Sequence, residues 1–322
     1  MSGGTWGVVR FVALRLLATA ALLLVASFVV FGLLHLAPGD PARNLLGPRT
    51  PNPDTLAAIR AEYHLDDSFL DQYFWWLGNV VHGDLGHSIR SKDVTVGSLL
   101  AERGVLTFQL ASFAFVLTLL TALPLGVAAG FRAGGVIDRT VSIGAVIGVG
   151  APSFAVGLVL LYLFGLYFPI FPEYGDGSGG LDRYWHLTLP AITLAFGLAA
   201  LVVKLTRTAV ITELRQDYVT FARSRGLTSG QIRRLVLRNA MIPVATSLGL
   251  VFAFLFGGTI LVETTFSLGG IGSLLVDSVS FKDIPVVQAI TLLTAAVIAL
   301  TALLVDLTYL VIDPRVRQRA AS

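Results

Sequence analysis

Six stretches of the chain are apolar, lack Asp, Glu, Lys and Arg, and are long enough to cross a lipid bilayer. The hydrocarbon core of a bilayer is about 30 Å thick, and a helix needs roughly 20 residues to span it. In chain order the stretches are 16–36, 104–131, 140–172, 184–203, 239–262 and 284–305. We therefore expect an all-α integral membrane protein with six transmembrane helices.

The third of these stretches is too long for one span. It contains Pro152, and it ends in the run Phe-Pro-Ile-Phe-Pro at 168–172. Proline interrupts a helix because it lacks an N–H and its ring clashes with the preceding turn. We expect the tail of this stretch to leave the helix as an extracytoplasmic loop.

The first stretch resembles a signal peptide, because Arg10 and Arg15 precede it. Its length of about 22 residues exceeds the ~7–15 residues of a typical signal-peptide core. We therefore interpret residues 16–37 as a retained first span.

Composition supports a protein dissolved in lipid. The chain has 322 residues, of which 55% are hydrophobic and 13% are charged, whereas soluble domains carry about 25% charged residues. It has no cysteine, which excludes disulfides, thiolate metal sites and a cysteine nucleophile. The net charge of +3 is sorted along the chain rather than gathered in one patch, so we expect no nucleic-acid partner.

Charge sorting predicts the orientation. Lys and Arg near span ends stay in the cytoplasm. With both termini inside, the cytoplasmic parts hold 15 basic and 4 acidic residues, and the outer parts hold 8 basic and 15 acidic ones. The predicted domains are a cytoplasmic N-terminus (1–15), the first span (16–37), a large extracytoplasmic loop (38–103), the remaining five spans (104–312) and a cytoplasmic tail (313–322).

The large outer loop carries two predicted helices. Asp54 is expected to cap a short helix through Tyr63. A stretch at 69–77 is dense in aromatic residues, which suits the headgroup zone of a membrane. It could cover the outer mouth as an interfacial helix, form a docking platform for an extracytoplasmic partner, or do both.

Three acidic residues near span ends are candidates for structural or gating roles. Asp306 lies inside the sixth span, and we expect it to pair with Lys204 or Arg207 in a structural ion pair. Glu263 follows the fifth span and could gate the outer mouth or cap a turn. Asp313 follows the sixth span.

Enzyme signatures are missing from the sequence. The chain has no P-loop pattern for ATP phosphates, no His-Glu-x-x-His pattern and no clear serine nucleophile elbow. The five histidines are scattered, which argues against a metal site. We therefore expect no catalytic residue, no cofactor and no metal in this chain.

The most informative segment lies between the fourth and fifth spans. Residues 204–238 hold eight of the 23 Lys and Arg residues. Helical character at 217–224 ends at Gly226, and Thr228 with Ser229 can cap a second helix. The segment could be an amphipathic helix on anionic lipid, or its apolar residues could fill a groove in a soluble partner. Those apolar residues are Leu214, Tyr218, Phe221 and Ala222.

Here a family resemblance emerges. The sequence YVTFARSRGL at 218–227, followed by LRNAMIPV at 237–244, resembles the coupling-loop motif of ABC importer permeases, most closely the dipeptide/oligopeptide and nickel permease family. Thr220 and Phe221 replace the Glu and Ala usual in that motif. Further matching segments, in order, are APGDP at 37–41, HLDD at 64–67, GDLG at 83–86, LP at 189–190, GGIG at 269–272 and DPR at 313–315.

The resemblance implies a type I permease bundle with a cytoplasmic coupling-helix elbow in the loop 207–240. It implies partners: a second homologous permease, two ABC ATPases that hold ATP and Mg²⁺, and an extracytoplasmic substrate-binding protein. The residues implied to couple to the ATPase are Tyr218, Phe221, Ala222, Arg223, Arg225, Gly226 and Leu227.

The implied function is ATP-driven uptake across a bacterial plasma (inner) membrane, with this multi-pass chain forming half of the pathway. Short peptides are the favoured substrate, and nickel, opines or other small solutes stay open. The alternative from the residues alone is a stand-alone secondary transporter or channel for a small solute, which would need inverted repeats or broken helices around midplane polar groups. A membrane enzyme or scaffold would need reactive side chains within the spans.

Overall fold

A computed structural model describes residues 3–36, 39–46, 52–91 and 94–312. Within these ranges the backbone is helical, and the only pairing of extended segments is an isolated bridge between His87 and Thr95. The all-α prediction is confirmed.

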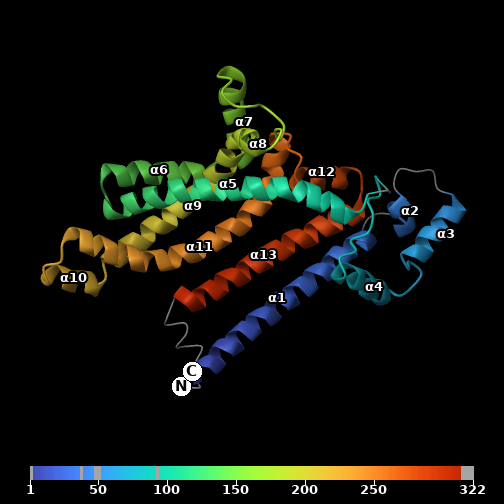
Figure 1. The fold of residues 1–322 in the computed structure, drawn as a ribbon, viewed down its shortest axis with the longest axis horizontal. Coiled ribbons are helices and arrows are strands. Elements are labelled where there is room, and N and C mark those ends of the chain that lie inside the picture. Colours follow the sequence, from blue (N-terminus) through green and yellow to red (C-terminus); the bar gives the residue numbers. More distant parts are fainter. Residues whose placement is uncertain (1–2, 37–38, 47–51, 92–93, 313–322) are drawn as a thin grey trace. The chain divides into compact units, whose positions relative to one another are not determined.

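Among the described residues, five helices are long and apolar enough to cross a membrane; Figure 1 shows how they run. They are α1 (Gly3–Leu36), α5 (Val96–Phe131), α9 (Thr188–Leu214), α11 (Ser229–Thr265) and α13 (Ile284–Ile312). Each of them contains one of the predicted spans or most of it. Several extend beyond the apolar runs because helical hydrogen bonding continues into polar sequence. The N-terminal segment 1–15 is therefore largely part of α1, and α5 begins before residue 104.

The third predicted span is a bent pair rather than one straight helix. It comprises α6 (Val136–Gly150), α7 (Ser153–Leu161) and a π-helical turn, η1 (Tyr162–Tyr167), and it is bent by 103° at the break between α6 and α7. The break falls at Ala151 and Pro152, earlier than the expected departure at 168–172. Proline excludes the helical conformation from the residue before it, and Ala151 is accordingly extended, with ψ of 123°. Six spans result if the bent pair counts as one.

Six shorter helices complete the described part of the fold. They are α2 (Pro41–Leu46), α3 (Pro53–Glu62), α4 (Phe69–Val81), α8 (Gly180–His186), α10 (Asp217–Ser224) and α12 (Ile271–Ser280). The prediction that Asp54 caps α3 is wrong. Asn52 is the N-cap, and its side chain accepts a hydrogen bond from the Asp54 backbone N–H. Pro53 fixes the first helical position, so the cap lies one residue before it.

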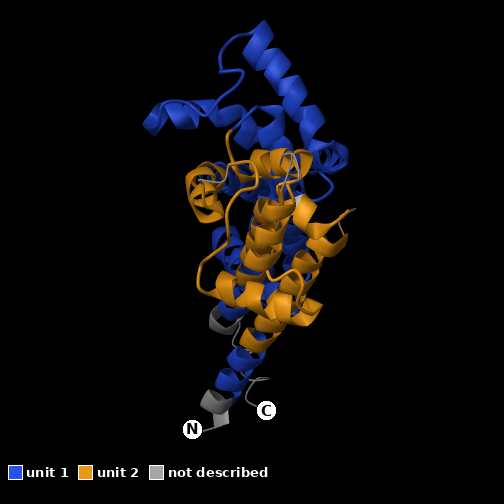
Figure 2. Ribbon diagram, turned by 90° about the vertical axis from the view of Figure 1, so that its right-hand side faces the viewer, with its two compact units in different colours: residues 1–15, 109–268, 301–322 blue, residues 16–108, 269–300 orange. Residues whose placement is uncertain are grey.

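The chain divides into two compact units (Figure 2). Unit 1 comprises residues 1–15, 109–268 and 301–322, and unit 2 comprises 16–108 and 269–300.

In unit 2, the aromatic stretch predicted at 69–77 forms α4 and packs on α1. Tyr73 is buried, its hydroxyl lies 2.9 Å from Ser27 Oγ, and its ring meets Phe28 edge to face. Gln72 is also buried and lies 3.1 Å from His35 Nε2. Phe74, on the other face, is exposed. The helix therefore has one face in the core of unit 2 and exposed aromatic side chains outside it, which suits the headgroup zone of a membrane.

In unit 1, glycines let three helices approach closely. A Cβ at Gly126 or Gly130 of α5 would lie 2.7 Å from side-chain atoms of α9, and a Cβ at Gly148 of α6 would lie 2.8 Å from Ala200 Cβ. Small residues at such contacts are how membrane helices pack backbone against backbone. Helix α9 is thereby held tightly between α5 and α6.

Candidate functional site: the α10 elbow

The basic segment singled out in the sequence forms a compact elbow between two long helices of unit 1. Helix α9 ends at Leu214, α10 covers Asp217–Ser224, and α11 starts at Ser229 (Figure 1). The predicted helix bounds, the stop at Gly226 and the cap at Thr228 are all confirmed. The part outside the two long helices is only 215–228, which is shorter than the predicted loop 207–240.

Local hydrogen bonds fix both sides of the turn after α10. The Leu227 N–H donates to the Ala222 carbonyl at 3.1 Å, and the Gly226 N–H donates to the Arg223 carbonyl at 3.0 Å. These two bonds define a Schellman motif, which requires a left-handed residue at its centre. Gly226 supplies it, with φ of +78°.

A capping box starts the next helix. The Thr228 N–H donates to Gln231 Oε1 at 2.9 Å, and the Gln231 N–H donates to Thr228 Oγ1 at 3.4 Å. Each side chain satisfies a backbone donor that the helix itself leaves unpaired. The elbow is therefore closed by adjacent C-terminal and N-terminal caps.

One face of α10 belongs to the core of unit 1. Val219 and Ala222 are buried in a cluster with Val210 of α9 and with Ile232 and Val236 of α11. Tyr218 lies at the edge of this cluster, and its hydroxyl donates to Glu213 Oε2 at 2.5 Å. Burial and then the adjacent Glu213 carboxylate raise the pKa of Tyr218 above its ordinary value. The elbow therefore moves with the ends of α9 and α11.

The opposite face is open and basic. Phe221 is 70% exposed, and Arg223 and Arg225 are exposed as well. Within the described residues neither arginine forms an ion pair. A large exposed aromatic beside free guanidinium groups is typical of a surface that binds a protein partner.

Five of the seven predicted coupling residues line one shallow hollow of about 400 Å³. They are Tyr218, Phe221, Ala222, Arg225 and Leu227. Gly226 shapes the turn beside the hollow, and Arg223 lies on the exposed face. Ala222 differs from the expectation, because it is only 7% exposed and packs inward. It forms the floor of the hollow and is not a protruding contact.

The sequence did not predict an ion pair that joins α9, the helix leading into the elbow, to α6. Arg207 of α9 binds the buried carboxylate of Asp138 of α6 through Nε and through Nη2, the latter at 2.8 Å from Oδ2. Asp138 also accepts from the Gly134 N–H at 2.7 Å and from Ser142 Oγ at 3.3 Å. The only sequence feature that could have pointed to this ion pair is the position of Asp138 in the first turn of α6. This pair fastens α9 to α6.

The prediction for the partner of Asp306 is therefore wrong. Asp306 Oδ2 lies 3.0 Å from Arg15 Nη1, whereas Arg207 binds Asp138.

Glu263, in the last turn of α11, is completely buried, and its backbone carbonyl accepts a hydrogen bond from the Leu268 N–H at 2.9 Å. Asp313 lies outside the described residues. In those residues no group of three or more His, Asp or Glu side chains is arranged to hold a metal ion.

Comparison with known proteins identifies the chain. Residues 122–318 match the family model described as the inner membrane component of binding-protein-dependent transport systems, and residues 8–111 match the model of its N-terminal part. This chain belongs to that family. It is a multi-pass permease subunit of the bacterial inner membrane and is not itself catalytic, as the resemblance implied.

Named relatives cover nearly all of the permease. The probable peptide ABC transporter permease protein y4tP of Sinorhizobium fredii is 34% identical over 307 residues, covering 94% of this chain and 97% of its own length. The glutathione transport system permease protein GsiC of Salmonella choleraesuis is 35% identical over 311 residues, covering 96% of this chain and 99% of its own. The permease subunit therefore corresponds to these proteins over nearly its whole length.

Proposed function

We propose that this permease subunit belongs to an ABC importer of short peptides and that the α10 elbow couples it to an ATPase subunit. The names of the relatives support the substrate class, since one is a peptide permease and the other a glutathione permease. Glutathione is itself a tripeptide, so di- and tripeptides are the substrates to test first. The complete importer contains a second homologous permease, two ATPases that hold ATP and Mg²⁺, and an external binding protein.

The geometry of the elbow carries the coupling proposal. A coupling helix needs one face packed on the permease helices that move and one face free to contact the ATPase, and α10 has both. Val219 and Ala222 fix the inner face, while Phe221 and Arg225 stand free on the outer face. An ATPase surface that holds Phe221 would carry α9 and α11 with it when it moves, because the two caps leave the turn little freedom. Rigid-body transmission through a packed contact is one established form of switching.

The contacts that hold α9 to its neighbouring helices extend the proposed coupling from the elbow to α5 and α6. The Arg207–Asp138 pair and the glycine contacts at Gly126, Gly130 and Gly148 join α9 to α5 and α6. A displacement of α9 therefore acts on these helices as a group. We propose that this group changes the access of the pathway from one side of the membrane to the other, with the elbow in the cytoplasm.

Paired variants test the coupling. Arg225→Glu reverses a charge that lines the hollow, whereas Arg234→Glu reverses an exposed charge on α11 outside it. In proteoliposomes with the purified complex, Arg225→Glu combined with Phe221→Ser should lower ATP-dependent uptake of a labelled dipeptide at least tenfold. Binding of the dipeptide to the external binding protein should not change.

The matched control is Arg234→Glu, which should keep uptake within about twofold of wild type. Wild-type uptake in the double variant would contradict the coupling role. Uptake of a labelled inorganic nickel salt but of no di- or tripeptide by the wild-type complex would contradict the substrate class and leave the coupling test intact.

A further inference from the structure

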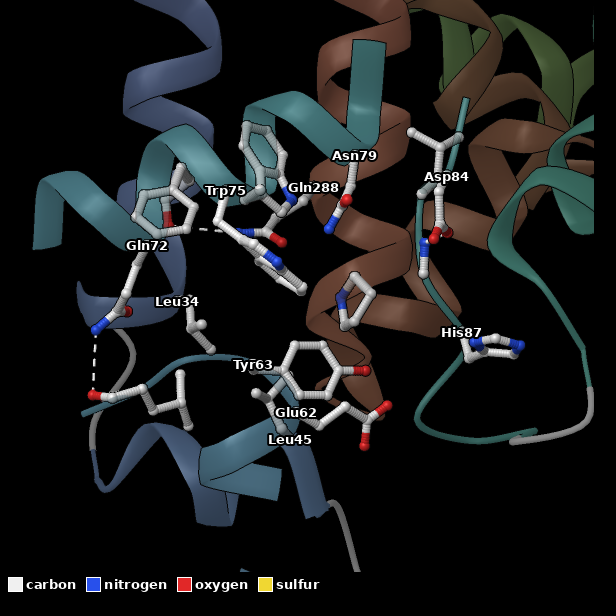
Figure 3. Close-up of a pocket in the computed structure, with 16 residues that line it drawn as sticks. Leu34, Leu45, Glu62, Tyr63, Gln72, Trp75, Asn79, Asp84, His87 and Gln288 are labelled. Carbon is white, nitrogen blue, oxygen red and sulfur yellow. Dashed lines mark hydrogen bonds between the residues drawn. The ribbon is translucent and has the colours of Figure 1, made fainter. Parts of the chain in front are cut away.

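Unit 2 contains a cavity that the coupling proposal does not use. Its volume is about 320 Å³, and it lies among α1, α3, α4, the segment 84–87 and the start of α13 (Figure 3). Pockets for small molecules begin at about 300 Å³. The cavity is thus large enough for a compact organic molecule.

A buried glutamine forms part of the inner wall of the cavity. Gln288 of α13 is 6% exposed, and its Nε2 donates to the carbonyls of Val30 and Phe31 at 3.2 and 3.3 Å. Its Oε1 faces the cavity (Figure 3). An amide oxygen in a cavity wall can accept hydrogen bonds, so the wall is suited to a ligand that donates one. The side-chain amide of Asn79 lines the same space.

The charge of the lining favours a cation. Glu62 and Asp84 lie at the exposed mouth, and no Lys or Arg of the described residues lines the cavity. Of the lining residues only His87 can become positive. The negative charge of Glu62 and Asp84 also acts on the cavity wall. Burial together with these nearby carboxylates raises the pKa of Tyr63, which lines the cavity.

Aromatic rings supply the remaining surface. Tyr63, Trp75 and Trp76 line the cavity together with aliphatic side chains. Rings of this kind attract ammonium groups through their negative faces and bury the apolar body of a ligand. Rings, an amide acceptor and carboxylates at one mouth form a combination that recognises organic ammonium compounds.

We propose that this cavity binds a small organic ammonium compound with an apolar body and no acidic group. The ammonium group donates to Gln288 Oε1 and lies in the field of Glu62 and Asp84, while the apolar body packs on Trp75 and Trp76. Phosphate-bearing lipids with ammonium headgroups fit less well, because the lining offers no Lys or Arg to their phosphate. The site belongs to unit 2, it is separate from the elbow, and it does not depend on the proposed function.

Isothermal titration of the purified full-length chain in lipid nanodiscs tests the charge requirement. Three probes of matched size differ in charge: 2-phenylethylammonium, 2-phenylethanol and 3-phenylpropionate. The ammonium probe should bind at least about tenfold more tightly than the alcohol, and the carboxylate should bind most weakly. Equal binding of the ammonium compound and the alcohol, or no binding of the ammonium compound at millimolar concentration, would overturn the proposal.

Variants locate the binding. The double variant Glu62→Gln/Asp84→Asn should weaken binding of the ammonium probe about tenfold, and Asp66→Asn, an exposed carboxylate of the same segment outside the cavity, should stay within about twofold. Both double-variant positions are exposed, so folding should be retained. Equal affinity in the double variant and the wild type would place the binding elsewhere and overturn the proposal.

Lipid composition separates the two sources of ammonium groups. Nanodiscs of phosphatidylglycerol contain no ammonium headgroup, whereas phosphatidylethanolamine supplies one. The proposal predicts the same probe affinity in both, within about twofold. A tenfold weaker affinity with phosphatidylethanolamine would show that a lipid headgroup competes for the cavity and would overturn the assignment to a compound without an acidic group.

Discussion

The elbow of unit 1 and the cavity of unit 2 each form a concave surface. The two surfaces differ in charge and in whether neighbouring or distant residues of the chain form them. The hollow at the elbow is lined by Arg225 beside Phe221, and it is built from a single run of ten residues, 218–227. The cavity is lined by Glu62 and Asp84 beside aromatic rings, and its residues are spread from 31 to 288. The elbow offers arginine guanidinium groups to a protein surface, whereas the cavity offers carboxylate and amide oxygens to a small cation.

Because the elbow and the cavity are built differently, they should respond differently to substitutions. The elbow is held by caps between neighbouring residues, so it should keep its local shape while its attachment to other helices changes. The cavity exists only when α1, α3, α4 and α13 are assembled. Variants that weaken one of these surfaces should therefore leave the other unaffected.

The largest expected effect comes from Asp138→Ala. It removes the charged hydrogen bonds between the buried carboxylate and Arg207, and because the Arg207 side chain is 32% exposed and stays hydrated, the loss should be about 1.5–3 kcal/mol. Urea unfolding in detergent should show this loss, and dipeptide uptake should fall. Binding of 2-phenylethylammonium by any remaining folded protein should not change.

Asp306→Ala is the matched control, because its partner Arg15 has a side chain that is 47% exposed. Exposed pairs contribute about 1 kcal/mol or less. An equal loss of stability in both variants would contradict the role of the Arg207–Asp138 pair as the fastening of α9.

Gly226→Val should have an intermediate effect. A Cβ at this position meets no atom within 4 Å, so the cost is purely conformational. A β-branched residue at positive φ costs about 1–2 kcal/mol, whereas Asn tolerates this conformation. Uptake and thermal stability should both fall in Gly226→Val and largely recover in Gly226→Asn. Equal loss of uptake in the two variants would mean that the conformation of the turn does not matter.

The smallest expected effect concerns the titration of Tyr63. Burial and neighbouring carboxylates raise its pKa above the ordinary 10.0, so the folded state favours the neutral phenol. That contribution to stability is complete below the ordinary pKa and is lost as the pH rises through the folded-state value. In Glu62→Gln/Asp84→Asn, ultraviolet titration should show one tyrosine ionising at lower pH than in wild type. Tyr63→Phe identifies the transition, and an unchanged titration would contradict the negative field of the cavity.

The elbow could be predicted from sequence because its determinants are local. Gly226 and Thr228 act within a few residues of themselves, and the helix bounds at 217–224 follow from them. The inward face of Ala222 was missed, since helical spacing alone does not say which apolar positions meet α9 and α11. The same limit explains Asp306, whose partner Arg15 lies almost 300 residues away, and Asp138, whose partner lies on another helix.

The bent third span and the cavity illustrate the remaining limits. Pro152 was visible in the sequence, but the size of the bend depends on packing between α7 and α9. Nothing in the sequence places Gln288 and Trp75 in the wall of one cavity, because that arrangement requires the fold of unit 2. The orientation of the spans in the bilayer follows from charge sorting and stays a prediction.

Cysteine cross-linking tests the central claim, that α10 docks on the ATPase, most directly. The chain has no native cysteine, so Phe221→Cys introduces a single reactive site on the exposed face of α10. Thr264→Cys, exposed at the other end of α11, is the control. With a short thiol-to-amine cross-linker in the assembled complex, the account predicts an adduct between this permease and the ATPase subunit from Phe221→Cys and none from Thr264→Cys. Labelling of Phe221→Cys by a membrane-impermeant reagent added outside intact cells, with no ATPase adduct, would contradict it.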